Sequence, residues 1–453
     1  MIRARIIELL KKDNFQSLLS NMITALIGIV SFSLLARKLN TEDFSNYIIF
    51  VTGASLIEML RFGITSNATI CFLPGTKQKK REQIIGSFVK INLLTSFALS
   101  FFIFLIKSFF YDYIRNSSFE LFFNWYPYIL IASIPFNNAL TIFQADIKFN
   151  KILFIRILNN FLFFLVILIG TLYWGITLNE LILYFLYIQI FLSGLCIVLK
   201  WDYLISFKNS NNKEINKILN FGKFSVFTLL SSNLLRNADV FIIGLGALGS
   251  NAVAIYSIPL KLTEIMQVPL RSFAATAFPK ISKAYTQGNL KKVKYIFNTY
   301  TGAISIFFIF IAIFILIFDR ELIILISGHS YLNNGSEHLN ILIITQILTI
   351  YCLILPLDKM TGITLDSLNK PQINSFKVLI MLLTNLLGDI IAVFIFKSLE
   401  LVAITSILFT LLGSYLGIYY LNKELQLSIK DILLYGLKFY SNISKRTYLI
   451  IKK

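Results

Sequence analysis

The sequence predicts an all-α polytopic membrane protein with about twelve transmembrane helices. Its 453 residues are 56% hydrophobic and only 14% charged, with a mean hydropathy of +0.73, whereas soluble domains contain about 25% charged residues. Apolar runs long enough to cross a bilayer recur along the whole chain. A transmembrane β-barrel would instead show alternating segments of about ten residues, so these continuous runs indicate helices.

The expected spans follow one another with mostly short connections. We place them near residues 15–36, 45–72, 84–110, 122–143, 153–174, 178–199, 222–246, 252–275, 297–318, 339–366, 374–396 and 400–421. The fourth and tenth contain Pro127, Pro135 and Pro356, and prolines often kink membrane helices where neighbours satisfy the freed carbonyls. The basic segment MIRARIIELLKKDN precedes an apolar run longer than that of a signal peptide, so we expect an uncleaved first span.

Lys and Arg are distributed unequally between the connections. The termini and the even-numbered connections hold most of them. The odd-numbered connections hold only Arg37, Lys38, Lys107, Arg115, Arg320 and Lys397. The positive-inside rule therefore predicts that both termini are cytoplasmic. Topology then accounts for most of the net charge of +19, and we do not expect nucleic-acid binding.

The connection that begins at Lys200 divides the chain into an N-terminal lobe, residues 1–205, and a C-terminal lobe, residues 206–453, of about six spans each. Within it, NKEINKILNF is a candidate short surface helix. The basic, aromatic tail LLYGLKFYSNISKRTYLIIKK is either an interfacial helix or partly disordered.

The turns after the first and the seventh span resemble each other, because Leu39 precedes Tyr47 by the same interval as Leu248 precedes Tyr256. This similarity suggests duplicated halves, which in transporters enclose a site near the membrane midplane.

The same turns resemble motifs of polysaccharide-type flippases. The motif AR-x-L-G-x-x-x-F-G-x-Y is matched by Ala36, Arg37, Leu39, Phe44 and Tyr47, with Asn40 and Ser45 in place of the usual glycines. The motif D-x-x-x-I/L-x-x-x-L-G-x-x-x-V-x-x-Y is matched by Asp239, Leu248, Gly249 and Tyr256. The loop P-x-I-S-x-x-Y-x-x-G is matched by Pro279, Ile281, Ser282, Tyr285 and Gly288.

The chain thus resembles the O-antigen-type or capsule-type flippases of the multidrug/oligosaccharidyl-lipid/polysaccharide (MOP) exporter superfamily. The resemblance implies two six-helix bundles forming a V around a central cavity. It also implies alternating-access transport of undecaprenyl-pyrophosphate-linked oligosaccharide units across the bacterial inner membrane, for O-antigen, capsule or exopolysaccharide biosynthesis. Candidate partners are this substrate, membrane lipids, and polysaccharide polymerase and chain-length proteins. No cofactor or metal is expected.

Charged residues within the expected spans are candidates for a functional site, because a charge at the bilayer centre costs about 2.5–3.5 kcal/mol on insertion scales. The planar fork of Arg suits phosphate oxygens, so the substrate-binding candidates are Arg61, Arg156, Arg236 and Arg271. The candidates for ion coupling or gating are Glu58, Asp239, Lys261, Glu264 and Asp389.

Three of these charges have an opposite charge three residues away, which places the two on neighbouring positions of one helix and lets them partly neutralise each other. The pairs are Glu58 with Arg61, Arg236 with Asp239, and Lys261 with Glu264. The alternative for any of these residues is a structural role that holds helices together.

Two other functions are considered. A multidrug or cation antiporter of the same fold would need an acidic cavity, whereas these spans are rich in Arg. A polysaccharide polymerase or ligase would present catalytic residues on a large outer loop, and the expected outer loops are short. The segment Gly244 to Gly249 fits a dinucleotide fingerprint but ends a span instead of following a strand. His329 and His338 have no nearby Cys. We therefore expect a transporter and no enzyme, with its driving force undetermined.

Overall fold

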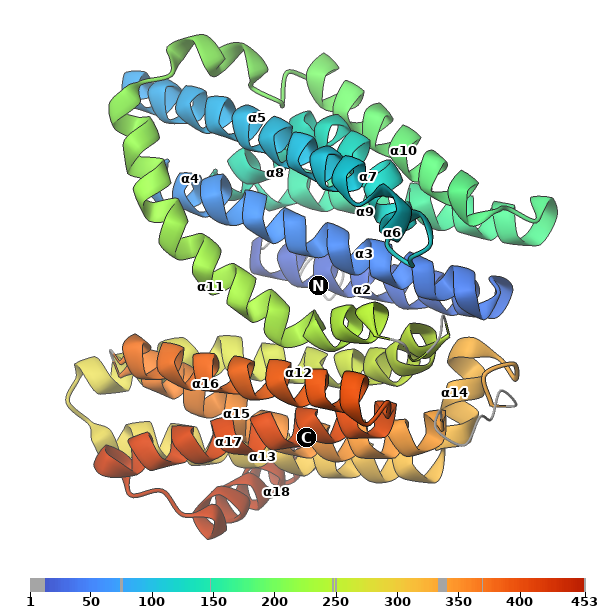
Figure 1. Cartoon of the computed structure of the whole chain (residues 1–453). Coiled ribbons are helices and arrows are strands. Elements are labelled where there is room, and N and C mark those ends of the chain that lie inside the picture. Colours follow the sequence, from blue (N-terminus) through green and yellow to red (C-terminus); the bar gives the residue numbers. More distant parts are fainter. Residues whose placement is uncertain are drawn as a thin grey trace. The chain divides into compact units, whose positions relative to one another are not determined.

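The protein is described by a computed structural model that covers residues 13–73, 76–146, 148–246, 248, 251–332, 340–368 and 370–451. Every regular element in these ranges is helical. The chain divides into two compact units between Leu234 and Leu235, and Figure 1 shows the helices of each. The basic segment before Asp13, part of the Gly244 to Gly249 turn, and His338 lie outside the described residues.

Unit 1 is a helical bundle. Its elements are α2 (Asp13–Lys38), α3 (Thr41–Arg61), the π-helical turn η1 (Phe62–Ser66), α4 (Asn67–Phe72), α5 (Gln78–Phe109), α6 (Tyr111–Arg115), α7 (Glu120–Ala132), α8 (Ile134–Ala145), α9 (Phe149–Ile169), η2 (Gly170–Trp174), α10 (Leu178–Val198), η3 (Leu204–Asn209) and the first part of α11 (Asn212–Leu245). One buried cluster joins α5 to α8 through Phe88 and Ile142. Another joins α8 to α10 through Phe143 and Leu192.

The fourth expected span is broken in two. Helices α7 and α8 meet at Ser133 with a bend of 56°. Pro135 lies in the first turn of α8, where its missing amide leaves no intrahelical bond unmade. Pro127 stays inside α7, and its carbonyl accepts a hydrogen bond from Ser100 Oγ at 2.8 Å. Pro356, by contrast, lies within a helix that continues without a break.

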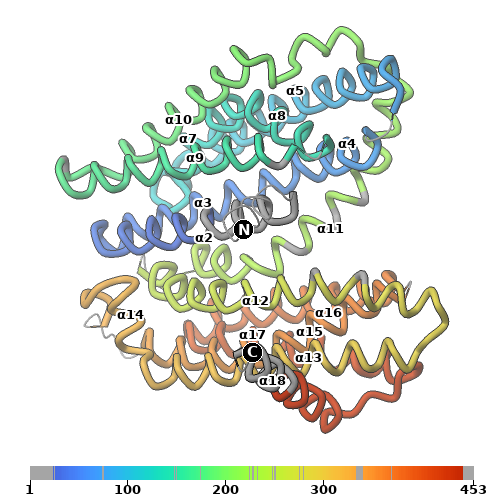
Figure 2. Tube along the Cα trace, turned by 180° about the vertical axis from the view of Figure 1, so that it is seen from behind, coloured from blue at the N-terminus to red at the C-terminus, as the bar shows by residue number. Residues whose placement is uncertain are grey.

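Unit 2 contains the remaining helices. They are the second part of α11, α12 (Ala252–Thr286), α13 (Leu290–Ile317), α14 (Asp319–Ser327), α15 (Ile341–Ser367), α16 (Pro371–Ile390), η4 (Ile391–Ile395), α17 (Leu399–Leu425) and α18 (Ile429–Ile451). Helices α12, α13, α15 and α17 share a core that includes Ala277, Phe297, Met360 and Leu421. Figures 1 and 2 show these helices side by side, with α18 against α13.

Eight helical segments in the described ranges are long and apolar enough to cross a membrane, and the bent pair α7–α8 makes nine if it is one span. All twelve expected ranges overlap helices, but α2, α11 and α12 are not among these eight. In α11 and α12, charged residues such as Arg236 and Lys261 lower the hydropathy. Length and composition therefore support fewer spans than the twelve expected, and the larger number stays a prediction.

The division between the units falls within α11, later in the chain than the lobe boundary expected at 205/206. The first part of α11 packs closely on unit 1: a Cβ at Gly222 would lie 2.4 Å from the carbonyl oxygen of Ile64, and one at Gly63 would lie 2.8 Å from Val226 Cα. The segment NKEINKILNF is thus the start of a long helix and not a separate surface helix. The lobe boundary at 205/206 stays a prediction.

The connection before α11 and the C-terminal tail both contain helix. The short helix η3 packs on α5. Nearby, Ser87 Oγ on α5 accepts a hydrogen bond from the Asn211 backbone amide at 3.0 Å. The tail forms α18, so a helix is the correct one of the two alternatives for this segment.

We predict that Gly222→Ala destabilises the protein, because the added Cβ meets backbone that cannot move without shifting η1. The expected loss is about 1–3 kcal/mol, typical of overpacking a tight contact. Thermal unfolding of the purified protein in detergent measures it. Gly194→Ala in α10 is the matched control: its Cβ meets nothing within 4 Å, and alanine there stabilises a helix by about 0.5–1 kcal/mol. Equal melting temperatures for the two variants would contradict the prediction.

Candidate functional site

Two carboxylates of unit 2 share hydrogen-bond partners. They are Asp239 on α11 and Asp389 near the end of α16. Asn385, one turn before Asp389, donates from Nδ2 to Asp239 Oδ1 at 3.2 Å and to Asp389 Oδ2 at 3.0 Å. Tyr256 Oη on α12 donates to Asp239 Oδ2 at 2.6 Å, and Thr405 Oγ1 on α17 donates to Asp389 Oδ1. Four helices therefore meet at this carboxylate pair.

The carboxylate pair is buried without a balancing cation. Asp239 is 4% exposed and Asp389 0%, and within the described ranges no Lys or Arg forms an ion pair with either one. Two ionised carboxylates in such a site repel each other and lose their hydration. The pair therefore needs a bound proton or cation to be stable.

The remaining groups around the pair offer oxygen atoms that could act as ligands to a cation. Besides the carboxylates there are the hydroxyls of Thr405 and Tyr256, and Oδ1 of Asn385 is buried without a partner. Oxygen ligands suit hard cations. In the part of the chain that the structure describes, no group of three or more His, Cys, Asp and Glu side chains gathers. The site therefore suits a proton or a small monovalent cation.

The expected pairing of Arg236 with Asp239 is wrong. Although the two residues are three positions apart on α11, Arg236 is exposed while Asp239 is buried. Asp239 takes its hydrogen bonds from Tyr256 and Asn385 instead. Arg236 and Asp239 therefore differ in exposure, and within the described ranges they form no ion pair with each other.

Arg236 lies in an exposed basic cluster together with Arg271 on α12 and Lys359 on α15. The three positive charges lie close enough to repel one another. Among the described residues no carboxylate forms an ion pair with any of them. Three exposed positive charges that repel one another are suited to contact with water or with an anionic ligand.

The pair Lys261 and Glu264 forms as expected. Lys261 Nζ and Glu264 Oε2 are 2.8 Å apart on α12, and both side chains are half-buried. Glu264 also lies near enough to Arg271 to attract it. The predicted gating role of this ion pair remains a prediction.

Arg61 in unit 1 is enclosed by protein. Its Nη2 donates to both carboxylate oxygens of Glu58 at 2.7 and 2.6 Å. Its Nη1 donates to the Leu130 carbonyl and to Ser133 Oγ, each at 3.3 Å. The Arg61 side chain is 3% exposed and that of Glu58 37%. The expected Glu58–Arg61 pair is therefore confirmed.

This geometry favours the structural alternative for Arg61. Leu130 and Ser133 lie at the break between α7 and α8, so the guanidinium holds α3 to the bent span. A side chain with so little exposed surface has no free fork for a phosphate. Arg156 on α9 differs: it is exposed, and within the described ranges no acid pairs with it, so it stays a candidate for substrate binding.

Several residues that complete these sites could not be selected from the sequence. Asn385 and Thr405 are uncharged, and nothing in their local sequence relates them to Asp239. Lys377 is buried on α16, where its Nζ lies 2.7 Å from Asp358 Oδ1. Only the one-turn spacing of Asn385 and Asp389 could have suggested a shared helix face.

Another charged group lies outside the spans, at the end of α8. Asp146 accepts hydrogen bonds from Arg81 Nη2 at 2.8 Å and from Lys148 Nζ at 2.8 Å. Burial raises the pKa of Asp146. The hydrogen bonds from Lys148 and Arg81 and their positive charges outweigh burial, so the pKa of Asp146 stays below its ordinary value. This group ties α5 to the end of the broken span.

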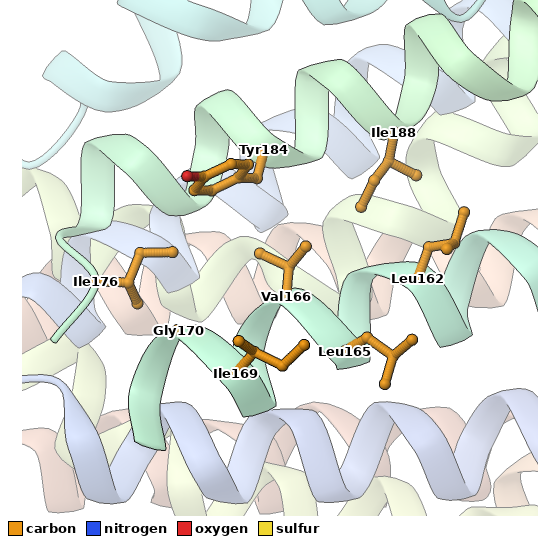
Figure 3. A pocket seen from close by; sticks show the side chains of 8 residues that line it. All are labelled: Leu162, Leu165, Val166, Ile169, Gly170, Ile176, Tyr184 and Ile188. Carbon is orange, nitrogen blue, oxygen red and sulfur yellow. The ribbon is translucent and has the colours of Figure 1, made fainter. Parts of the chain in front are cut away.

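An apolar pocket lies between α9 and α10 in unit 1 (Figure 3). Leu162, Val166 and Ile188 point into it, and Tyr184 lies along its edge. It contains no charged side chain, so it cannot balance the charge of an ion or a phosphate.

Solved structures with the same fold are transporters of the MOP superfamily. An inward-facing multidrug resistance MATE family transporter has 16% identity and a TM-score of 0.72, covering 92% of this chain and 100% of its own. The lipid II flippase MurJ, in an inward closed conformation, has 15% identity and a TM-score of 0.73, covering 94% and 90%.

A third structure is a MOP superfamily transporter from Pyrococcus furiosus for which a binding pocket of reverse polarity is described. It has 15% identity and a TM-score of 0.61, covering 91% of this chain and 94% of its own. At these identities the likeness establishes the fold. The chain is thus a multi-pass membrane protein with the fold of MOP transporters.

Sequence comparison identifies the family. Residues 10–285 match the polysaccharide biosynthesis protein family, and residues 224–362 match the MatE family. The chain therefore belongs to the polysaccharide biosynthesis protein family, which confirms the resemblance seen in its motifs. No curated protein matches the chain in sequence.

We predict that Arg61→Met lowers stability by about 2 kcal/mol, because Glu58 loses its partner and the Leu130 carbonyl loses a donor. Thermal unfolding and the amount of folded protein in the membrane measure this loss. Arg156→Met is the control, with little change expected at an exposed position. If Arg61→Met were as stable as the unaltered protein but inactive in transport, substrate binding would replace the structural role.

Proposed function

We propose that this protein is a flippase. It moves undecaprenyl-pyrophosphate-linked oligosaccharide repeat units from the cytoplasmic to the outer leaflet by alternating access, for O-antigen, capsule or exopolysaccharide biosynthesis. The observation that carries the proposal is the basic cluster of Arg236, Arg271 and Lys359, in which no side chain forms an ion pair with a carboxylate within the described ranges. Membership of the polysaccharide biosynthesis protein family supports it, as does the fold shared with a lipid II flippase.

Charge and geometry favour an anionic head group as cargo. Arg236 and Arg271 each offer a guanidinium fork that can bind two phosphate oxygens at once. A lipid-linked pyrophosphate carries such oxygens at the membrane surface. A carrier of cationic drugs would instead require exposed acids, whereas Asp239 and Asp389 are buried and Glu264 is paired with Lys261. Transport of this kind needs no catalytic residue.

Cation binding at Asp239 and Asp389 supplies the proposed coupling. The pair is stable when a proton or a small cation is bound, and it becomes strained when the site is empty. Asp239 and Arg236 lie three residues apart on α11, so a movement of this helix shifts the buried site and the basic cluster together. An ion gradient can therefore bias the exposure of the cargo site.

The proposed topology follows from the distribution of charge. Twelve spans, including α2, α11 and α12 and counting α7 and α8 as one broken span, leave both termini on the cytoplasmic side of the bacterial inner membrane. Polysaccharide polymerase and chain-length proteins are proposed partners because they would receive the flipped units.

We predict that Arg236→Ala and Arg271→Ala each reduce translocation at least tenfold, since one hydrogen bond to a charged group contributes about 1.5–3 kcal/mol. The measurement is the transfer of a lipid-pyrophosphate-linked oligosaccharide in proteoliposomes, scored by access of an external probe to the sugar. Arg320→Ala is the control, because Arg320 is exposed on α14, outside the cluster. Normal transfer by both cluster variants would refute the anion site, and export of cationic drugs by the wild-type protein would favour the antiporter.

We predict that a monovalent cation raises the melting temperature of the purified protein through Asp239 and Asp389. Ligand at 100 times its Kd stabilises a folded protein by about 2.7 kcal/mol. Titration with Na⁺ against K⁺, repeated at several pH values, distinguishes sodium from proton coupling. Asp389→Asn and Asp239→Asn should abolish the response, while Asp112→Asn on the exposed helix α6 should retain it. A response that persists in the Asp389→Asn variant would place the cation elsewhere.

A further inference from the structure

The C-terminal helix α18 is held against α13 by a close crossing of two glycines. A Cβ at Gly302 would lie 1.9 Å from the carbonyl oxygen of Ile432, and one at Gly436 would lie 2.4 Å from the carbonyl carbon of Gly302. Near the crossing, Tyr440 Oη donates to the Ala303 carbonyl at 3.0 Å. Such contacts between small residues allow helices to approach closely within membranes.

A second contact ties the start of α18 to the charged end of α13. Lys294 Nζ donates to the Gln426 carbonyl at 2.6 Å and lies 3.6 Å from Asp431 Oδ2. Lys294 is in the first turns of α13, which is itself one of the eight candidate spans. The helix α18 therefore begins at the level where α13 enters the membrane.

The crossing lies deeper than this charged end. Gly302 is eight residues beyond Lys294, and an α-helix rises 1.5 Å per residue, so the crossing is about 12 Å farther along α13. Interfacial helices bury their apolar face by about 5–10 Å into the boundary between headgroups and acyl chains. For a membrane boundary at Lys294, the crossing at Gly302 lies at the depth of acyl chains.

One exposed side of α18, next to the surface that packs on α13, is apolar. Ile429, Leu433 and Leu437 repeat every four residues and are 65%, 41% and 60% exposed, whereas Ile432 on the packed side is 5% exposed. Protein covers the packed surface, the exposed Lys430 and Lys438 lie on the side opposite to it, and the apolar side between them is left for a second apolar environment. In the described part of the chain α18 is not among the candidate spans, so it does not need to cross the bilayer to bury this face.

Basic residues flank this apolar face. Lys430 and Lys438 are exposed on α18, and Lys438 Nζ lies 5.5 Å from the ring centre of Tyr435. Long lysine side chains can extend from such a helix to the headgroup level while their stems stay among apolar groups. A basic residue near an anionic membrane surface is attracted to the headgroups.

We propose that α18 is a lipid-binding helix that lies in the membrane leaflet on the Lys294 side of unit 2. Ile429, Leu433 and Leu437 contact acyl chains, and Lys430 and Lys438 bind anionic headgroups. In the topology proposed above this leaflet is the cytoplasmic one. The inference does not depend on the cargo, because it rests only on the packing of α18 and α13.

The position of α18 has a consequence for α12. Phe439 of α18 packs against Phe273 of α12, with ring centres 6.3 Å apart. Phe273 lies two residues after Arg271 of the basic cluster. Lipid bound to α18 therefore restrains the helix that carries a proposed cargo residue, and the anionic lipid content of the leaflet should affect the stability of unit 2.

The test places an indole on the exposed face of α18 in the full-length protein. Trp125, Trp174 and Trp201 are replaced by Phe, Leu437→Trp is added, and the protein is reconstituted in bilayers that contain acyl-brominated lipids. Phe310→Trp, at a 69% exposed position of α13, is the acyl-depth reference in the same background. Lys430→Trp reports the headgroup side of α18. Acrylamide quenching measures access from water.

We expect bromine to quench the indole at position 437 about as strongly as the one at position 310, with little quenching by acrylamide, and to quench the one at position 430 less. Strong acrylamide quenching at position 437 would overturn the proposal by placing this face in water. Protection from both quenchers would also overturn it, since the face would then be covered by protein, such as a second copy of the chain.

The headgroup part of the proposal has its own measurement. The melting temperature of the wild-type protein should be higher in bilayers that contain phosphatidylglycerol than in phosphatidylcholine alone. The double variant Lys430→Gln/Lys438→Gln should lose this difference. The double variant Lys77→Gln/Lys79→Gln, at the exposed start of α5 in unit 1, is the matched control and should keep it. If the α18 variant kept the full difference, headgroup binding by these two lysines would be refuted even if position 437 lies among acyl chains.

Discussion

The hydrocarbon core of a bilayer has no water to solvate a charge or to bond a free backbone group, and this constraint explains where most polar side chains of this protein lie. Arg61 binds Glu58 and donates to the Leu130 carbonyl beside the break between α7 and α8. Lys377 is paired with Asp358 within unit 2. Each of these charges is balanced by a partner a few ångströms away. Such pairs hold helices together without leaving a charge for a ligand.

Two groups of charged side chains in unit 2 do not follow this pattern: one is acidic and buried, and the other is basic and exposed. Asp239 and Asp389 are buried with only uncharged donors around them, so they lack a positive charge. Arg236, Arg271 and Lys359 are exposed and repel one another, and none of them forms an ion pair with a carboxylate in the described ranges. A cation-coupled carrier of an anion needs one site of each kind. Helix α11 carries Asp239 of the carboxylate pair and Arg236 of the basic cluster. A movement of this one helix could therefore couple the two sites, as proposed.

Close backbone contacts at glycines fix the framework around these groups. In unit 1, Gly63 and Gly222 let α11 pack against the π-helical turn η1, and in unit 2, Gly302 and Gly436 let α18 cross α13. Within lipid, helices gain little from the hydrophobic effect on packing together, so dispersion contacts at small residues contribute much of the attraction. The same contact that docks α18 also leaves its Leu437 side exposed, and this side is where we infer that lipid binds.

The sequence by itself determined the fold class, the approximate positions of the long helices and the family, because apolar length and short motifs are local properties of the chain. It also paired Glu58 with Arg61 and Lys261 with Glu264 correctly, since both pairs share one helix face. Only the tertiary structure decided that Arg236 and Asp239 point into different environments, that Asn385 and Thr405 complete the carboxylate pair, and that Arg61 is enclosed. These outcomes depend on which helices pack against each side chain. Helical spacing alone cannot specify which helices pack against a side chain. Of two residues three positions apart, one can be buried while the other is exposed.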